Sequence, residues 1–239
     1  SADYAKRLRS IPAVQVNIAE RECPKLLLSD MGEIKYSRVT SKSNYLRTGT
    51  FVSIDVETTG LHAGRNELIE VAAIRFEEWE PVAILQSLVK PKKPLSDEIM
   101  KLTGITNDML AEAPSFSSIL GDLEAFVGDL NIVGYNLPFD LSFLYKNGFD
   151  FTAKTRKYFD VLEIVRTVLK KPKKKWDKEL ESYEINYDSE FDVYDHKLTT
   201  VCSYYGIREE EDAHRAASDA LATGIVFKCV AQEKIPNDT

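Results

Sequence analysis

Two acids interrupt an apolar, strand-like run that begins at residue 51. The run reads FVSIDVETTGL from Phe51 to Leu61, and it turns at Thr58-Thr59-Gly60. Residues two apart on a β-strand point to the same face, so Asp55 and Glu57 project together. A like-charged pair on a buried strand is costly without a cation, and Mg²⁺ prefers such oxygen ligands. The run therefore predicts a strand with a cation site. The plainer alternative is an edge strand with two solvated acids.

The elements that follow predict an α/β domain. Strand-like runs at 50–56, 67–76 and 82–89 are separated by turn signals at 60–66 and near Pro81, which favours an antiparallel meander. A short buried strand is predicted at 132–135. Helical periodicity covers 96–103, 115–128, 137–146, 161–171, 197–205 and 213–234, with Ser96 and Ser115 as N-cap residues of the first two. Strands first, then strands alternating with helices, indicate a mixed sheet flanked by helices.

The chain divides into an extension and a main domain. Residues 1–47 are expected to be an N-terminal extension with a short helix and a small hairpin, and residues 48–239 the main domain. A charged insert at about 170–196 carries a lysine run followed by seven acids. Charge blocks are typical of a solvated loop. The functional alternative is that the lysines contact a phosphate backbone. Aromatic residues in the insert indicate that part of it packs or pairs as strands.

Composition limits the class of protein. Hydrophobic residues make up 44% of the 239 residues and charged residues 29%, an ordinary globular composition. No run of about 18 apolar residues and no secretory signal is found, so no membrane partner is expected. Three cysteines without C-x-x-C spacing indicate reduced thiols and a cytoplasmic location. A net charge of −7 argues against nucleic-acid binding through bulk charge, although bound cations can invert the sign of an acidic site.

Three further residues carry candidate chemistry. Asp140 lies in the first turn of the helix predicted after the short strand, where an acid alone would only stabilise the helix dipole. His214 and Asp219 lie near the start of the last helix. A spacing of five residues does not place both on one helix face, so a shared site requires His214 at the helix start. Alone, these two would be a surface histidine and a capping-region acid.

Taken together, the motifs resemble the DEDDh 3′–5′ exonuclease superfamily, which includes the proofreading epsilon subunit of bacterial DNA polymerase III. The resemblance covers about residues 50–232. It rests on the Asp55-x-Glu57-Thr-Thr-Gly-Leu61 segment, on Asn136-x-x-Phe-Asp140-x-x-Phe143-Leu and on His214-x-x-x-x-Asp219. The segment 101–107, KLTGITN, is also similar to a linker of that family. The 1–47 extension and the 170–196 insert depart from the compact family core.

The resemblance implies an RNase H-like fold with a central mixed five-stranded sheet, and a metal-dependent exonuclease that releases nucleoside 5′-monophosphates. It implies two divalent cations, Mg²⁺ or Mn²⁺, held by four acids. Asp55 would bridge both ions, Glu57 and Asp219 would complete the first, and Asp140 would serve the second. His214 would be the general base, since an imidazole titrates near neutrality.

The substrate implied is a single-stranded 3′ end of DNA, with a DNA polymerase as a candidate partner. Backbone groups at Thr58, Thr59 and Gly60 would approach the terminal nucleotide, near Asn136, and Leu61 and Phe143 would pack against its base. Phe143 suits core packing equally well.

Two alternatives stay open at this point. The motifs do not separate DNA from RNA, so an oligoribonuclease-like or RNase T-like RNA exonuclease fits them as well. A non-catalytic nucleic-acid-binding or polymerase-binding module is disfavoured by the intact set of four acids and a histidine. A P-loop ATPase is disfavoured because the sequence lacks G-x-x-x-x-G-K-[ST].

Overall fold

A computed structural model describes most of the chain from residue 49 to residue 234. The gaps within it are 152–155, 178–180, 187–188 and 208–214. The expected extension at 1–47 and the candidate base His214 lie outside the described residues. Within them, no helix is both long enough and apolar enough to cross a bilayer.

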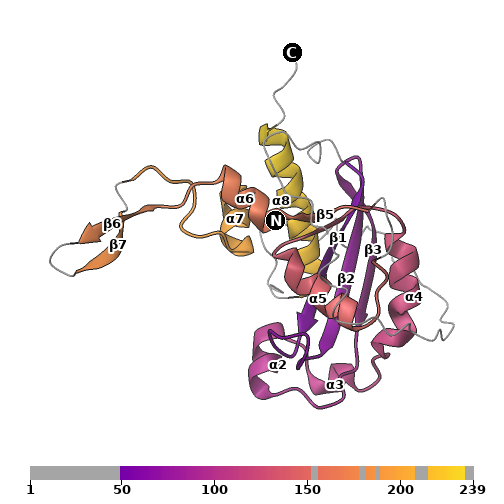
Figure 1. Cartoon of the computed structure of the whole chain (residues 1–239). Coiled ribbons are helices and arrows are strands. Elements are labelled where there is room, and N and C mark those ends of the chain that lie inside the picture. The colour runs from indigo at the N-terminus through magenta and orange to yellow at the C-terminus, as the bar shows by residue number, and fades with distance from the viewer. Residues whose placement is uncertain (1–48, 152–155, 178–180, 187–188, 208–214, 235–239) are drawn as a thin grey trace.

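A mixed five-stranded sheet forms the centre of the molecule (Figure 1), as predicted. Its order is β3-β2-β1-β4-β5. The first three strands form the expected antiparallel meander, and β4 and β5 extend it in parallel with β1. The strands are β1 Phe51–Thr58, β2 Leu68–Glu77, β3 Glu80–Leu88, β4 Ile132–Gly134 and β5 Tyr158–Asp160.

The central strand β1 contributes side chains to two separate cores, because successive side chains point to opposite faces of the sheet. Phe51 packs on one face with α8 (Ala216–Lys234), α6 (Val161–Val168) and α7 (Leu198–Tyr204). Val52, Ile54 and Val56 pack on the other face with α4 (Phe116–Val127) and α5 (Leu137–Lys146). Asp55 and Glu57 share the parity of Phe51 and therefore project on the α8 face.

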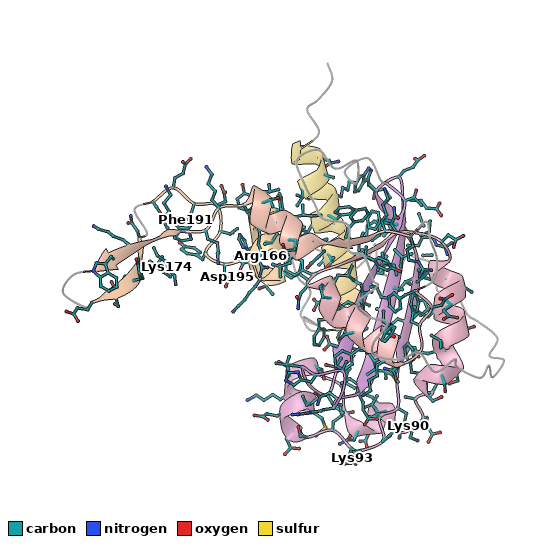
Figure 2. All side chains as sticks on the ribbon, in the orientation of Figure 1. Lys90, Lys93, Arg166, Lys174, Phe191 and Asp195 are labelled. Atoms are coloured by element: carbon teal, nitrogen blue, oxygen red, sulfur yellow. The ribbon has the colours of Figure 1, made fainter. Side chains whose placement is uncertain are left out.

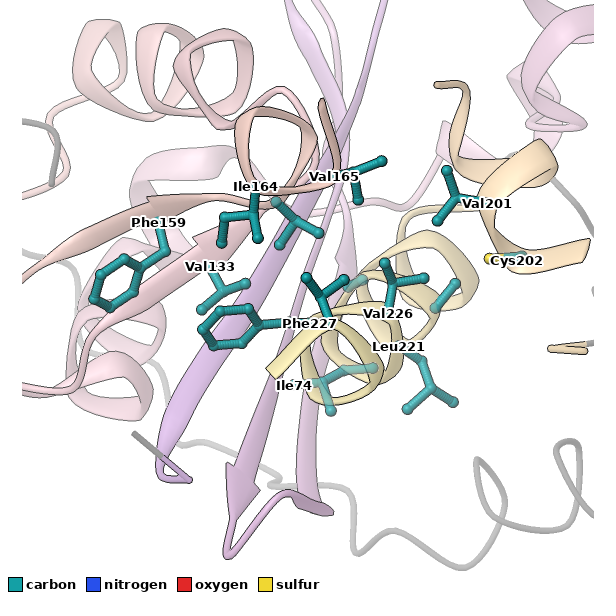
Figure 3. Packing of buried hydrophobic residues seen from close by; sticks show 14 of the residues in the cluster. Ile74, Val133, Phe159, Ile164, Val165, Val201, Cys202, Leu221, Val226 and Phe227 are labelled. Carbon is teal, nitrogen blue, oxygen red and sulfur yellow. The ribbon is translucent and has the colours of Figure 1, made fainter. Parts of the chain in front are cut away.

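Close packing of α8 on the sheet sets the position of its first turn. Figure 3 shows Phe227, Val226 and Leu221 of this helix among buried side chains of the sheet and of α6. A Cβ at Gly224 would lie 2.3 Å from two ring atoms of Phe76 on β2. Glycine in a helix interior costs ~0.5–1 kcal/mol relative to alanine. Here its small size allows the helix to approach the sheet closely.

Helix ends follow local chemistry where the sequence carries a signal. The Ser96 hydroxyl caps α2 (Asp97–Thr103) by accepting from the Ile99 amide, and Gly104 ends that helix in a left-handed conformation. Ser115 occupies the N-cap position of α4, but its side chain forms no capping hydrogen bond. The helix predicted to reach residue 171 ends at Val168, and Leu169 is already in an extended conformation.

Two short elements were not anticipated: α3 (Asn107–Leu110) and strand β5. A further pair of strands lies in the charged insert. Strand β6 (Lys173–Asp177) and strand β7 (Ser182–Asn186) form a separate antiparallel sheet. The expectation that part of the insert pairs as strands is thus confirmed. These residues do not form a loop, but most of their side chains are exposed, as expected for a solvated segment. The hairpin stands away from the body of the molecule (Figure 1).

Candidate metal centre

Three of the four predicted acids meet where β1 ends. Carboxylate oxygens of Asp55, Glu57 and Asp219 all lie within 4.8 Å of one another. The first two come from the strand, and Asp219 comes from the first turn of α8. Glu57 and Asp219, which are 162 positions apart in the chain, are thus brought together by the packing of α8 on the sheet. The register of β1 on β2 shifts directly after Glu57, so the strand bends at the acid cluster.

Asp140 reaches the same end of β1 from α5. Strand β4 pairs with β1 only at Val52 and Ser53, so the later residues of β1 have no strand on that side. The Asp140 Oδ1 atom accepts a hydrogen bond of 3.1 Å from the Val56 amide. The carboxylate is almost completely buried. It lies close enough to Asp55 to raise the pKa of that acid.

Burial and mutual repulsion make the cluster unfavourable without a cation. Burial, and then the neighbouring acids Asp140, Asp219, Glu57 and Glu70, raise the pKa of Asp55 well above its usual value. Burial also raises the pKa of Asp140.

Glu57 shows the same effect. Burial, and then Asp219 and Glu70, raise its pKa from 4.5 to about 8, although Arg215 opposes the shift. Crowded, desolvated carboxylates of this kind fit a divalent cation, which prefers hard oxygen ligands. The residues present therefore fit the metal site that the sequence predicts.

The turn after β1 presents the predicted substrate-contacting residues. Thr59 Oγ1 accepts from the Glu67 amide at 3.0 Å, and Asn66 Oδ1 accepts from the His62 amide at 3.0 Å. Thr58 Oγ1 donates to the Gly60 carbonyl at 2.7 Å. These hydrogen bonds stabilise the turn. The Leu61 side chain is exposed.

The two predicted contacts on the other side of the cluster differ in accessibility. Asn136 is exposed at the N-cap of α5 in a left-handed conformation. Phe143 is fully buried and packs beside Phe139, with ring centroids 5.1 Å apart. Of the two roles expected for Phe143, the structure shows core packing. Its ring has no exposed surface on which a base could stack.

Sequence reasoning missed a buried ion pair that fixes the start of α8. Glu70 on β2 is the cross-strand neighbour of Glu57, and its side chain is fully buried. Its two oxygens accept from Arg215 Nη2 at 2.6 Å and Nε at 3.0 Å, a bidentate pair. Glu70 also accepts from Gln86 and from the Ala216 amide at 3.2 Å. A buried acid thus satisfies an amide that the first turn of α8 would otherwise leave unpaired.

A second missed acid, Asp160, supports the start of α5. Its Oδ1 accepts from the Asn136 amide at 2.9 Å and from the Leu162 amide at 3.1 Å. Burial raises the pKa of Asp160. The sequence offered one signal for Glu70, a lone acid within the apolar run 68–76, and none for Asp160.

The ion pair predicts a large difference between two arginines with equal contact distances. Arg215→Leu should lower the free energy of unfolding by ~3–5 kcal/mol, because Glu70 is left charged and buried. Arg166 forms an equally short 2.6 Å bridge to Glu163, but side chains there are 54% and 60% exposed, against 28% and 0% for Arg215 and Glu70. Arg166→Leu should cost less than ~1 kcal/mol. Urea unfolding of both variants measures this, and equal losses would contradict it.

The sheet order and the acid cluster define a nuclease of RNase H-like fold. The match to the Exonuclease family (RNase_T) covers residues 52–227, so this chain belongs to that family. The resemblance to proofreading exonucleases is confirmed. The family and the acid cluster together point to dependence on a divalent metal.

Curated relatives are much longer than this chain. It is 32% identical over 192 residues to the PolC-type DNA polymerase III of Oceanobacillus iheyensis, covering 79% of this chain and 12% of the relative. The PolC-type enzyme of Bacillus subtilis is 33% identical over 185 residues, covering 76% of this chain and 11% of that protein. The chain thus spans about an eighth of the length of these relatives.

Solved structures share the fold at lower identity. E. coli exonuclease I in complex with single-stranded DNA is 21% identical with a TM-score of 0.57, over 78% of this chain and 41% of that one. Exonuclease X in complex with 5′-overhanging duplex DNA is 18% identical with a TM-score of 0.54, over 77% of this chain and 92% of that one. At these identities the likeness supports the fold alone.

Proposed function

We propose that this chain is a metal-dependent 3′–5′ exonuclease domain that removes nucleoside 5′-monophosphates from single-stranded DNA. The observation that carries the proposal is the convergence of Asp55, Glu57 and Asp219 within 4.8 Å, beside Asp140. Exonuclease I, a structural neighbour, is described in complex with single-stranded DNA. The curated relatives are PolC-type polymerases, so a DNA polymerase is the candidate protein partner.

The acids would hold two divalent cations, Mg²⁺ or Mn²⁺. Such a pair of ions stabilises both the attacking and the leaving oxygens of an in-line displacement at phosphorus. Asp140, Asp219 and Glu57 all raise the pKa of Asp55, so Asp55 is the acid that would serve both ions. Glu57 and Asp219 would complete one site, and Asp140, fixed by the Val56 amide, would serve the other.

The remaining residues orient the substrate and move the proton. His214 accepts the proton of the attacking water, a role suited to a neutral imidazole. Backbone groups of Thr58, Thr59 and Gly60 approach the terminal nucleotide, and the exposed Leu61 side chain packs against its base. Apolar stacking without contacts to base edges makes the enzyme tolerant of sequence.

A product analysis tests the proposal. Single-stranded DNA and RNA oligonucleotides labelled at the 5′ end are incubated with Mg²⁺, with Mn²⁺ and with chelator. We expect a ladder of DNA fragments shortened from the 3′ end, nucleoside 5′-monophosphates as the products, and no cleavage with chelator. Faster digestion of RNA than of DNA would indicate that RNA is the substrate. Internal cuts, or cleavage that persists in chelator, would overturn the mechanism.

A further inference from the structure

One face of the projecting hairpin carries exposed aromatic and apolar side chains. Trp176 pairs with Tyr183, and Lys174 pairs with Ile185. The alternation of strand residues places these four on one face, which we call the aromatic face. The rings of Trp176 and Tyr183 meet edge to face at 5.0 Å. Even so, Trp176 remains 47% exposed, Tyr183 67% and Ile185 48%.

The hairpin base is held firmly against the body of the molecule. The Lys170 amide donates to Asp192 Oδ2 at 2.7 Å, and the Lys170 carbonyl accepts from the Asp192 amide at 2.9 Å. Val193 is buried in the core with α8. The His196 ring is 2.9 Å from the Leu169 carbonyl, whose residue is also buried there. The hairpin is therefore an arm with a fixed root (Figures 1 and 2).

Strand stability alone does not account for the composition of the arm. A cross-strand aromatic pair strengthens a hairpin by ~0.2–1 kcal/mol, which explains why the rings touch. Lysine is a poor strand former, yet β6 begins with three lysines in a row, Lys173 to Lys175. Lysines on an edge strand also block pairing with other chains. That role accounts for lysines on the strand, but it leaves the exposed rings of Trp176 and Tyr183 beside them unexplained.

Aromatic rings beside lysines match one class of ligand. Single-stranded nucleic acid is bound by rings on which bases stack, with cationic groups along the phosphate backbone. Protein interfaces, in contrast, are depleted of lysine. The chain as a whole carries a net charge of −7, so a polyanion is attracted only by local basic segments such as 170–175.

We propose that the aromatic face binds the single strand upstream of the 3′ end that enters the acid cluster. Trp176 and Tyr183 would stack on bases, and Lys174 would contact phosphate. This proposal rests on the proposed function for the direction of the strand, but the binding surface itself is tested without catalysis. It assigns the charged insert a role in holding long single-stranded substrates.

The test measures binding in chelator, where no hydrolysis is expected. Fluorescein-labelled oligothymidylates of about 4 and about 16 nucleotides are titrated with the full chain, and anisotropy gives each Kd. Lys174→Glu should weaken binding of the longer probe roughly tenfold and flatten its salt dependence, while the shorter probe binds as before. Lys157→Glu, an equal charge reversal at an exposed lysine on the body, is the matched control and should leave both values unchanged.

Tryptophan fluorescence gives a readout that does not depend on the fold of a variant. The sequence has two tryptophans, and Trp79 is partly buried, with its ring packed against Phe51 and Phe227. The longer probe should therefore quench mainly Trp176, and Trp176→Phe should lose the quenching while keeping an aromatic pair. Quenching without nuclease activity would refute the proposed exonuclease function but would support nucleic-acid binding by the aromatic face. Unquenched fluorescence together with an unchanged Kd in Lys174→Glu would assign the face to edge protection or a protein partner and overturn the proposal.

Discussion

Asp55→Asn is expected to lower metal-dependent nuclease activity at least about a thousandfold while the chain still folds. A metal clamp on the transition state is worth several kcal/mol, and each 1.36 kcal/mol is tenfold in rate. Asp55 is the acid on which Asp140, Asp219 and Glu57 all act, so its loss removes the ligand common to both proposed sites. Digestion of labelled single-stranded DNA over a range of Mg²⁺ concentrations measures the effect. Asp129→Asn, at an exposed acid, is the control and should retain full activity.

The same substitution should stabilise the metal-free protein. The folded-state pKa of Glu57, about 8, lies above its usual 4.5, and that of Asp55 is also raised. Well below 3.8 and 4.5, the usual pKa values of Asp55 and Glu57, these groups are protonated in the folded and unfolded chains alike. As pH rises toward 8, the unfolded chain ionises readily and the folded chain does not, so stability falls. Asp55→Asn removes one member of this repulsive set.

Thermal unfolding in chelator at pH 4.5 and pH 8 checks this pair of expectations. The parent should lose stability between the two pH values, and Asp55→Asn should lose less. Added Mg²⁺ should restore the parent at pH 8, because a ligand that binds only the folded state raises its stability. A variant that is less stable than the parent at pH 8 and also inactive would mean that Asp55 supports the fold, and the metal assignment would fail.

Periodic elements of the fold were predictable, because each strand and helix carries its own pattern. The meander follows from alternation and turn signals in residues 50–89, and α5 follows from its apolar spacing and the Asn147–Gly148 end. Strand β5 was not predictable from pattern. Its three residues, Tyr158–Asp160, are too few to show a period, and the strand forms because β4 offers it a parallel partner.

The acid cluster was only partly predictable. The spacing of Asp55 and Glu57 on one strand fixes their common face, whereas their meeting with Asp219 depends on how α8 packs against the sheet. The contacts that set this packing are tertiary: Gly224 against Phe76, and Arg215 in its ion pair with Glu70. No local pattern indicates which buried acid pairs with which arginine. The supporting residues of the site therefore become visible only in three dimensions.

His214→Ala is expected to slow hydrolysis by ~10²–10⁴, the usual contribution of a general base. His214 lies outside the described residues, but the next residue is fixed. Arg215 is bound bidentately by Glu70, and the Ala216 amide donates to the same carboxylate. The chain therefore enters α8 at a defined point, four residues before the metal-binding candidate Asp219. The role proposed for His214 rests on its position in the sequence, five residues before Asp219, as in the family motif.

The pH profile and chemical rescue separate a proton-transfer role from a structural one. Imidazole side chains change charge between about pH 5 and 8, so the parent rate should rise with pH across that range. The His214→Ala rate should lack this rise, and added imidazole should restore part of the activity. Asp55→Asn is the control, because imidazole cannot replace a metal ligand of carboxylate type and no rescue is expected. A variant that keeps the parent's profile and does not respond to imidazole would remove His214 from the chemistry, and another group would have to accept the proton.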